Sequence, residues 1–249
     1  AIAREKAGIL RPGVAAIIGE PKEAIRDLLV AEAKKVGARP RTTASIKDSI
    51  AIEGDEAGEY LHITGSRMGD LDYQLIGDYQ RENALTVLLA LDELRNLGWK
   101  ITPDAVKAGF KNVWTLTGLM GRWMKLGDAP LTICDTGHNI GGWEKLIPQI
   151  NRLPRPLTMV LGFVNDKDLS HILPLLPEDA EYIFTKADIA RALPAEELAR
   201  EAAAAGRRGK VVTGVRKAYD EAKASGCASV FVGGSTYVLA DLLKSLQEK

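Results

Sequence analysis

Residues 132–142 (TICDTGHNIGG) place an acid, a histidine, an amide and three glycines directly after a short apolar run. Asp135 would lie at the end of a strand, where its carboxylate could accept hydrogen bonds from ribose hydroxyls or hold a cation. His138 and Asn139 would cap the following helix and face an anion docked at its N-terminus. A polar turn with Asn139 as a plain N-cap and His138 solvated explains the same residues equally well.

Three other side chains have a chemical and a plain interpretation. Arg122 follows the flexible Gly121 and could move onto a phosphate during domain closure, or form a surface ion pair. Asn83 is unusual one turn into a helix, so it could meet a purine amino group or a backbone carbonyl. Lys167, between two acids in residues 165–168 (NDKD), could touch a phosphate, although charged turns are usually solvated. Lys6 is one of many lysines, and physics alone does not single it out.

Regular alternation of strands and helices begins near residue 119. Strands are expected at 131–136, 157–163, 180–187, 209–214 and 228–234, and helices at 142–153, 169–177, 194–206, 215–225 and 235–248. This spacing predicts a parallel sheet covered on both faces. Ligands of such sheets bind beyond the carboxyl ends of the strands, which here carry Asp135 and, in residues 232–235 (VGGS), Ser235.

The first part of the chain is also predicted to be α/β. Helices are expected at 1–8, 22–37, 79–98 and 102–113, a strand at 14–20, and short β-like pieces at 39–46, 60–67 and 71–77. Thr102 is the expected N-cap of the last helix, with Pro103 at its first position. We place the boundary between the two parts within residues 115–121.

Composition excludes several classes of protein. The 249 residues are 46% hydrophobic and 27% charged, with 33 basic and 33 acidic side chains, which argues against a nucleic-acid or membrane-surface role. The two cysteines, Cys134 and Cys227, fit a reducing compartment and form no metal-binding spacing. No apolar run approaches the roughly 20 residues that span a bilayer, so the expected location is cytoplasmic.

Six motifs in order resemble those of the folylpolyglutamate synthase/dihydrofolate synthase family of the Mur ligase superfamily. They are EKAGI, GDYQRENA, the GR that contains Arg122, DTGHN, DKD and GGS. The resemblance implies that residues 1–118 are the remainder of a central P-loop-type ATPase domain and that residues 119–249 are a Rossmann-like C-terminal domain. In this family EKAGI falls in mid-chain, so the sequence resembles the second half of such an enzyme.

The family's reaction is ATP- and Mg²⁺-dependent ligation that forms a C–N bond. A folate or dihydropteroate carboxylate attacks the γ-phosphate of ATP, and the amino group of L-glutamate displaces phosphate from the acyl phosphate. The implied partners are these small molecules, with no nucleic acid and no membrane, and the full-length enzyme is expected to be a monomer.

By the same resemblance, individual residues receive roles. Lys6 matches a lysine whose carbamate helps hold Mg²⁺. Asn83 matches an asparagine that contacts adenine. Arg122 matches an arginine on the ATP phosphates, and Asp135 an acid on the ribose. His138 matches a catalytic histidine near the γ-phosphate and the incoming glutamate. Ser235 would lie near the glutamate, and Lys167 is a weaker candidate for that neighbourhood.

The sequence also departs from the family. DTGHNI stands where DGAHNP is commoner, and Tyr79 stands where many members have histidine, with Gln80 and Asn83 intact. These residues contain no phosphate loop (G-x-x-x-x-G-K-[S/T]), so the 249-residue chain alone is expected not to turn over. The alternatives are another Mur-type ligase that acts on cell-wall precursors and a non-catalytic nucleotide-binding module.

Overall fold

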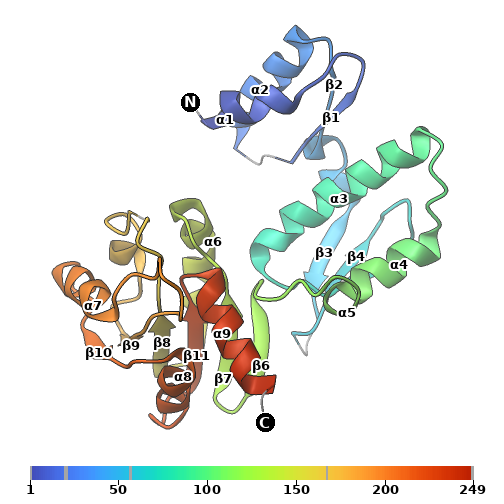
Figure 1. Cartoon of the computed structure of the whole chain (residues 1–249). Helices are drawn as coiled ribbons and strands as arrows, with labels where there is room; N and C mark the ends of the chain where they lie inside the picture. The colour runs from blue at the N-terminus through green and yellow to red at the C-terminus, as the bar shows by residue number, and fades with distance from the viewer. Residues whose placement is uncertain (1, 20–21, 56–57, 167, 248–249) are drawn as a thin grey trace. The chain divides into compact units, whose positions relative to one another are not determined.

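A computed structural model describes residues 2–19, 22–55, 58–166 and 168–247. The chain divides into two compact units, Ala1–Gly118 and Leu119–Lys249, and each is described here by itself (Figure 1). Within the described ranges, no helix has the length and apolar character needed to cross a membrane.

The first unit contains two small sheets and five α-helices among its described residues. The helices are α1 (Ile2–Lys6), α2 (Glu23–Lys35), α3 (Asp78–Asn96), α4 (Pro103–Lys111) and α5 (Val113–Thr117). The first sheet pairs β1 (Ala15–Ile18) and β2 (Arg39–Thr42) in parallel. The second is antiparallel and comprises β3 (Ala51–Gly54), β4 (Leu61–Thr64) and β5 (Leu71–Tyr73). Short 3₁₀ helices cover Ala7–Ile9, Thr43–Ser45 and Lys47–Ser49.

The apolar core of this unit lies between the antiparallel sheet and helices α3 and α4. Ile63 of β4 is fully buried, and the rings of Tyr73 and Phe110 pack with their centroids 5.0 Å apart. Helix α4 begins as the sequence predicts, since the Thr102 hydroxyl accepts a hydrogen bond from the Ala105 N–H at 3.2 Å and Pro103 follows it. Strand β3 was not expected, because residues 51–54 (AIEG) are too short for a clear alternation.

The second unit is a six-stranded sheet in the order β10-β9-β8-β11-β7-β6, parallel except for β6 at one edge. Its strands are β6 (Met124–Asp128), β7 (Leu131–Asp135), β8 (Leu157–Leu161), β9 (Ala180–Phe184), β10 (Gly209–Val211) and β11 (Ser229–Gly233). The long α-helices are α6 (Ile140–Ile150), α7 (Ala195–Ala204), α8 (Val215–Lys223) and α9 (Thr236–Gln247). All five residues of β8 and of β11 are buried, as expected for central strands of a parallel sheet.

The structure of this unit differs from the sequence prediction at two places. Residues 169–177 form turns and one 3₁₀ helix, Leu173–Leu175, because Pro174 and Pro177 interrupt a segment too short to bury a helical face. Strand β6 was not expected, because the sequence around Arg122 resembled a hinge, whereas its later residues pair antiparallel with β7.

A buried glutamate joins the parallel sheet of the first unit to its longest helix. Glu93 of α3 is 7% exposed, and its two carboxylate oxygens accept from Arg39 at 3.0 Å and Arg41 at 2.8 Å, both on β2. Both oxygens of this carboxylate are therefore satisfied by opposite charges. The hydrogen bond from Arg41 is the main cause that holds the pKa of Glu93 below its ordinary value of 4.5.

We predict that Glu93→Gln lowers the free energy of unfolding by about 1–3 kcal/mol at neutral pH, because one charged acceptor of two guanidinium groups is lost. The lowered pKa makes this stabilisation complete above pH 4.5 and lost as the pH falls through the folded-state value. Urea unfolding at several pH values measures both effects. The exposed Glu5→Gln is the matched control, and equal unfolding curves for the two variants would contradict the prediction.

Candidate functional site

The loops after β7, β8 and β11 meet at one edge of the sheet in the second unit. Gly233, the last residue of β11, is in register with both Asp135 of β7 and Leu161 of β8. The Gly162 N–H donates to the Gly233 carbonyl at 3.2 Å. The edge that contains Asp135 therefore also contains Ser235, as the sequence predicts for adjacent carboxyl ends of parallel strands.

Asp135 is buried at this edge, with 2% of its surface exposed. Its Oδ2 accepts from the Trp123 N–H at 2.7 Å, and its Oδ1 accepts from the Gly137 N–H at 2.9 Å. The carboxylate thus holds the segment before β6 and the loop after β7 together. The ribose contact expected of Asp135 stays a prediction, and in this arrangement the side chain is turned to the protein's own backbone.

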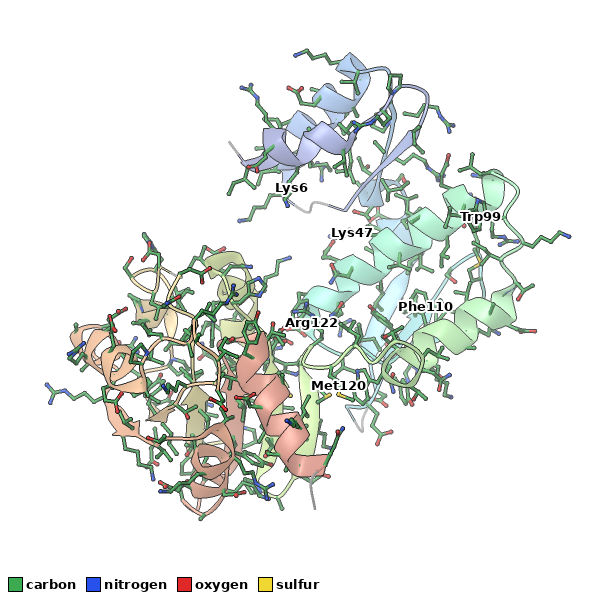
Figure 2. The ribbon with its side chains drawn as sticks, viewed as in Figure 1. Lys6, Lys47, Trp99, Phe110, Met120 and Arg122 are labelled. Carbon is green, nitrogen blue, oxygen red and sulfur yellow. The ribbon has the colours of Figure 1, made fainter. Side chains whose placement is uncertain are left out.

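Arg122 lies on the segment that leads into β6 (Figure 2) and is half-buried. One of its terminal nitrogens, Nη1, donates to Thr136 Oγ1 at 2.6 Å. The Thr136 N–H in turn donates to the Gly121 carbonyl at 2.9 Å. Gly121 has φ +73°, and a Cβ there would lie 2.5 Å from Leu239 Cδ2, so this position requires glycine.

The N-terminus of α6 begins directly after His138. Asn139 Oδ1 accepts from the Gly142 N–H at 2.8 Å, which makes Asn139 the N-cap. The exposed His138 has Nδ1 3.2 Å from the Thr136 carbonyl and Nε2 3.3 Å from Asn139 Nδ2. For a neutral ring these partners favour the tautomer with the proton on Nδ1. The N-cap predicted for Asn139 is therefore observed, and His138 is held by two neighbours instead of being only solvated. The anion contact expected of both residues stays a prediction.

Ser235 is 3% exposed, and its hydroxyl accepts from the Tyr237 N–H at 3.2 Å, at the beginning of α9. The preceding Gly234 has φ +98°, and a Cβ there would lie 2.6 Å from the Gly162 carbonyl oxygen. The chain of β11 thus passes very close to that of β8 where both strands end. Ser235 directly follows this tightly packed pair of glycines, Gly233 and Gly234, which we call the floor of the site.

The remaining candidates belong to the first unit. Lys6 is the last residue of α1 and is exposed (Figure 2). Asn83 lies on α3, and its Nδ2 donates to the buried Gln80 Oε1 at 2.8 Å. The candidates therefore fall into two groups, with Arg122, Asp135, His138 and Ser235 in the second unit. Lys167 lies outside the described residues.

The described residues do not assemble a metal site of their own. No three or more of their His, Cys, Asp and Glu side chains form a group that could hold a metal ion. Cys134 is fully buried, and burial raises the pKa of its thiol far above its ordinary value, so the thiol is neutral in this structure. A Mg²⁺ ion held through Lys6 would need ligands beyond the described residues.

A cavity of about 840 Å³ lies elsewhere in the second unit. Its lining includes Lys186, Arg216 and Lys217 together with Asp188, Asp220 and Asp241, and none of the candidate residues. Arg216 is paired with Asp220 at 2.8 Å. The mixed charges give this cavity no clear preference for an anion or a cation.

Sequence reasoning missed two residues of the site. Thr136 was treated only as part of the DTGHN motif, and its separation of 14 residues from Arg122 gave no sign of the hydrogen bond between them. Trp123 donates its backbone N–H to Asp135 and has φ +50°. No pattern in the sequence predicts either feature.

We predict that Asp135→Asn lowers the stability of the second unit by about 2–3 kcal/mol, because a charged acceptor of two backbone N–H groups is replaced by a neutral amide. Denaturant unfolding followed by tryptophan fluorescence measures the change. Asp128→Asn is the control, since Asp128 is exposed and its pair with Lys125 contributes little. A loss no larger than that of the control would contradict a structural role for Asp135.

Comparison with known proteins places these features in context. Residues 121–236 match the family described as Mur ligase, glutamate ligase domain. The folylpolyglutamate synthase of Lacticaseibacillus casei is 29% identical over 180 residues, which cover 68% of this chain and 39% of that protein. The dihydrofolate synthase/folylpolyglutamate synthase of Escherichia coli is 28% identical, with 100% of this chain and 56% of that protein covered.

Solved structures agree with the sequence matches. The folylpolyglutamate synthase of Mycobacterium tuberculosis, complexed with ADP and AMPPCP, aligns with a TM-score of 0.79 and 26% identity over 100% of this chain and 59% of that chain. Escherichia coli FolC in complex with DHPP and ADP aligns with a TM-score of 0.75 and 25% identity over 99% of this chain and 56% of that chain.

The relatives that align with nearly all of this chain are longer than it, and the chain spans little more than half of their length. The match to the glutamate ligase domain covers the whole edge formed by Arg122, Asp135, His138 and Ser235. The chain resembles the folylpolyglutamate synthase ligases along its length, and residues 121–236, most of its second unit, match the Mur ligase, glutamate ligase domain family.

Proposed function

We propose that this chain is the C-terminal part of an ATP- and Mg²⁺-dependent ligase that joins L-glutamate to a carboxylate of folate or dihydropteroate. Residues 1–118 would be the remainder of its central ATPase domain, and residues 119–249 its C-terminal Rossmann-like domain. The observation that carries the proposal is the loop after β7, within the residues that match the glutamate ligase domain. Arg122 donates to Thr136 of this loop, and His138 of the same loop directly precedes Asn139, the N-cap of α6.

The chemistry that this edge suits is stabilisation of a negatively charged phosphoryl group. The first-turn N–H groups of α6 and the helix dipole favour an anion. The structure gives the Arg122 guanidinium one hydrogen bond among the described residues, so four of its five N–H donors remain for phosphate oxygens. His138 is exposed beside them and would hold or accept a proton near the reacting groups.

The proposed reaction has two steps. A carboxylate oxygen of the pterin substrate bonds to the γ-phosphorus of ATP, and the bond to ADP breaks. The glutamate nitrogen then bonds to the acyl carbon, phosphate leaves, and the ammonium proton passes to a base. Phosphoryl transfer depends mainly on positioning and on positive charge, both of which Arg122 and α6 supply.

The remaining roles rest on the family resemblance together with the geometry. Asn83 uses Nδ2 toward Gln80, which leaves Oδ1 to accept from an adenine amino group. Ser235 lies at the edge where glutamate would bind. Lys6 is exposed, and its carbamate would supply an oxygen ligand for Mg²⁺. Cytoplasmic location and a monomeric state stay predictions.

We predict that the 249-residue chain alone releases no phosphate from ATP in the presence of glutamate and dihydropteroate, because its residues contain no phosphate loop. A phosphate-release assay measures this, with the Escherichia coli relative as the positive control. Release that depends on both ATP and glutamate would refute the prediction.

We predict that the full-length enzyme proposed above forms a glutamyl amide on dihydropteroate or folate. Arg122→Ala would lower its kcat about 10²–10³-fold, since a charge donor to the transition state is lost. His138→Ala would lower it about 10²–10⁴-fold. Mass spectrometry of products, with a cell-wall precursor as the competing substrate, checks the proposal. Activity on the cell-wall precursor alone, or on no substrate, would overturn it.

A further inference from the structure

We infer that Thr136 is a positioning residue, which holds the Arg122 guanidinium in place for an anion bound at the N-terminus of α6. The inference rests on the proposed function, because it assigns Arg122 to the phosphates of a nucleotide. Thr136 itself would touch neither the nucleotide nor the reacting atoms.

The geometry of Thr136 supports this role. It is 5% exposed, and its hydroxyl oxygen lies 2.6 Å from Arg122 Nη1. Its own N–H donates to the Gly121 carbonyl at 2.9 Å, and the neighbouring Asp135 accepts from the Trp123 N–H. Three hydrogen bonds thus connect Arg122 and the residues on both sides of it to Asp135, the last residue of β7, and to Thr136, which follows it.

The hydrogen bond between Arg122 and Thr136 depends on a residue that departs from the family motif. The commoner DGAHN has glycine where Thr136 stands, and a glycine has no hydroxyl to accept from an arginine. The following exchange fits the first one, because a Cβ at Gly137 would lie 2.5 Å from Leu146 Cδ1. The two exchanges together gain a hydroxyl at one position and leave room for Leu146 at the next.

The consequence is an arginine that is ordered before its ligand arrives. Arginine has many rotamers, and ordering them on binding weakens affinity. A bond from one terminal nitrogen to a buried hydroxyl restricts the rotamers and leaves the other donors available. The hydrogen bonds at Gly121 and Trp123 fix the backbone around Arg122 but not its side-chain rotamers, which the Thr136 hydroxyl restricts.

The test compares Thr136→Val, which keeps the shape but removes the hydroxyl, with Thr136→Ser, which keeps the hydroxyl. In the 249-residue chain without ligand, the NMR order parameter of the Arg122 Nε–Hε bond should fall below about 0.6 in Thr136→Val and be retained in Thr136→Ser. Thr158→Val is the matched control, because it removes another buried hydroxyl hydrogen bond in the same sheet, far along the chain from Arg122. Thermal unfolding confirms that each variant is folded.

A titration with ADP then separates positioning from a general effect on the fold. Thr136→Val should weaken ADP binding about 2- to 10-fold, and Thr136→Ser should restore it. In an Arg122→Ala background the same Thr136→Val change should have no effect on ADP affinity, because the guanidinium that the Thr136 hydroxyl positions is absent.

An unchanged Arg122 order parameter in Thr136→Val overturns the inference, as does an equal loss of ADP affinity with and without Arg122. Tighter ADP binding by Thr136→Val also overturns it, since Thr136 would then hold Arg122 away from its ligand. If the unaltered chain, which contains no phosphate loop, binds no ADP, the nucleotide role of Arg122 is tested instead in the full-length enzyme by the loss of kcat in Arg122→Ala. The order parameter alone then decides whether Thr136 fixes Arg122.

Discussion

The buried carboxylate of Asp135 is the interaction on which the candidate site depends. It accepts from two backbone N–H groups, one from the segment before β6 and one from the loop after β7. A charged acceptor makes stronger hydrogen bonds than a neutral one, and burial makes an unpaired partner costly. The position of Arg122 on one side and of the loop that carries His138 on the other therefore follows from a single side chain.

The parallel sheet adds a second constraint, because it brings together loops that are far apart in the sequence. The loops after β7 and β11 are about a hundred residues apart along the chain, yet Asp135 and Gly233 lie in register. In such a sheet the ends of adjacent strands share one edge, and helix N-termini begin there. An anion at this edge would meet hydrogen-bond donors from loops far apart in the sequence, and none of these donors would need to move far.

Much of this arrangement was predictable from local pattern. Strand and helix alternation indicated the sheet, and Thr102 and Asn139 were recognisable as N-caps because capping depends on residues three positions apart. The segment 169–177 was mistaken for a helix, since its apolar content outweighed Pro174 and Pro177. The partners of Asp135 could not be predicted, because Trp123 contributes a backbone group that carries no side-chain signature. The Thr136–Arg122 bond was equally hidden, as it depends on Gly121 and the register of β6 against β7.

The close approach of the strand ends limits how this site can change during evolution. A side chain at Gly234 would meet the Gly162 carbonyl at 2.6 Å, and one at Gly233 would meet the Asp135 carbonyl at 2.8 Å. Backbone atoms on both sides leave no room for even a methyl group, so these positions are closed to substitution. Evolutionary change is therefore left to exposed side chains near these strand ends, such as Tyr237 and Arg191, where the Arg191 guanidinium lies 5.2 Å from the centroid of the Tyr237 ring. The floor of the site would remain a fixed element while its surroundings diversify.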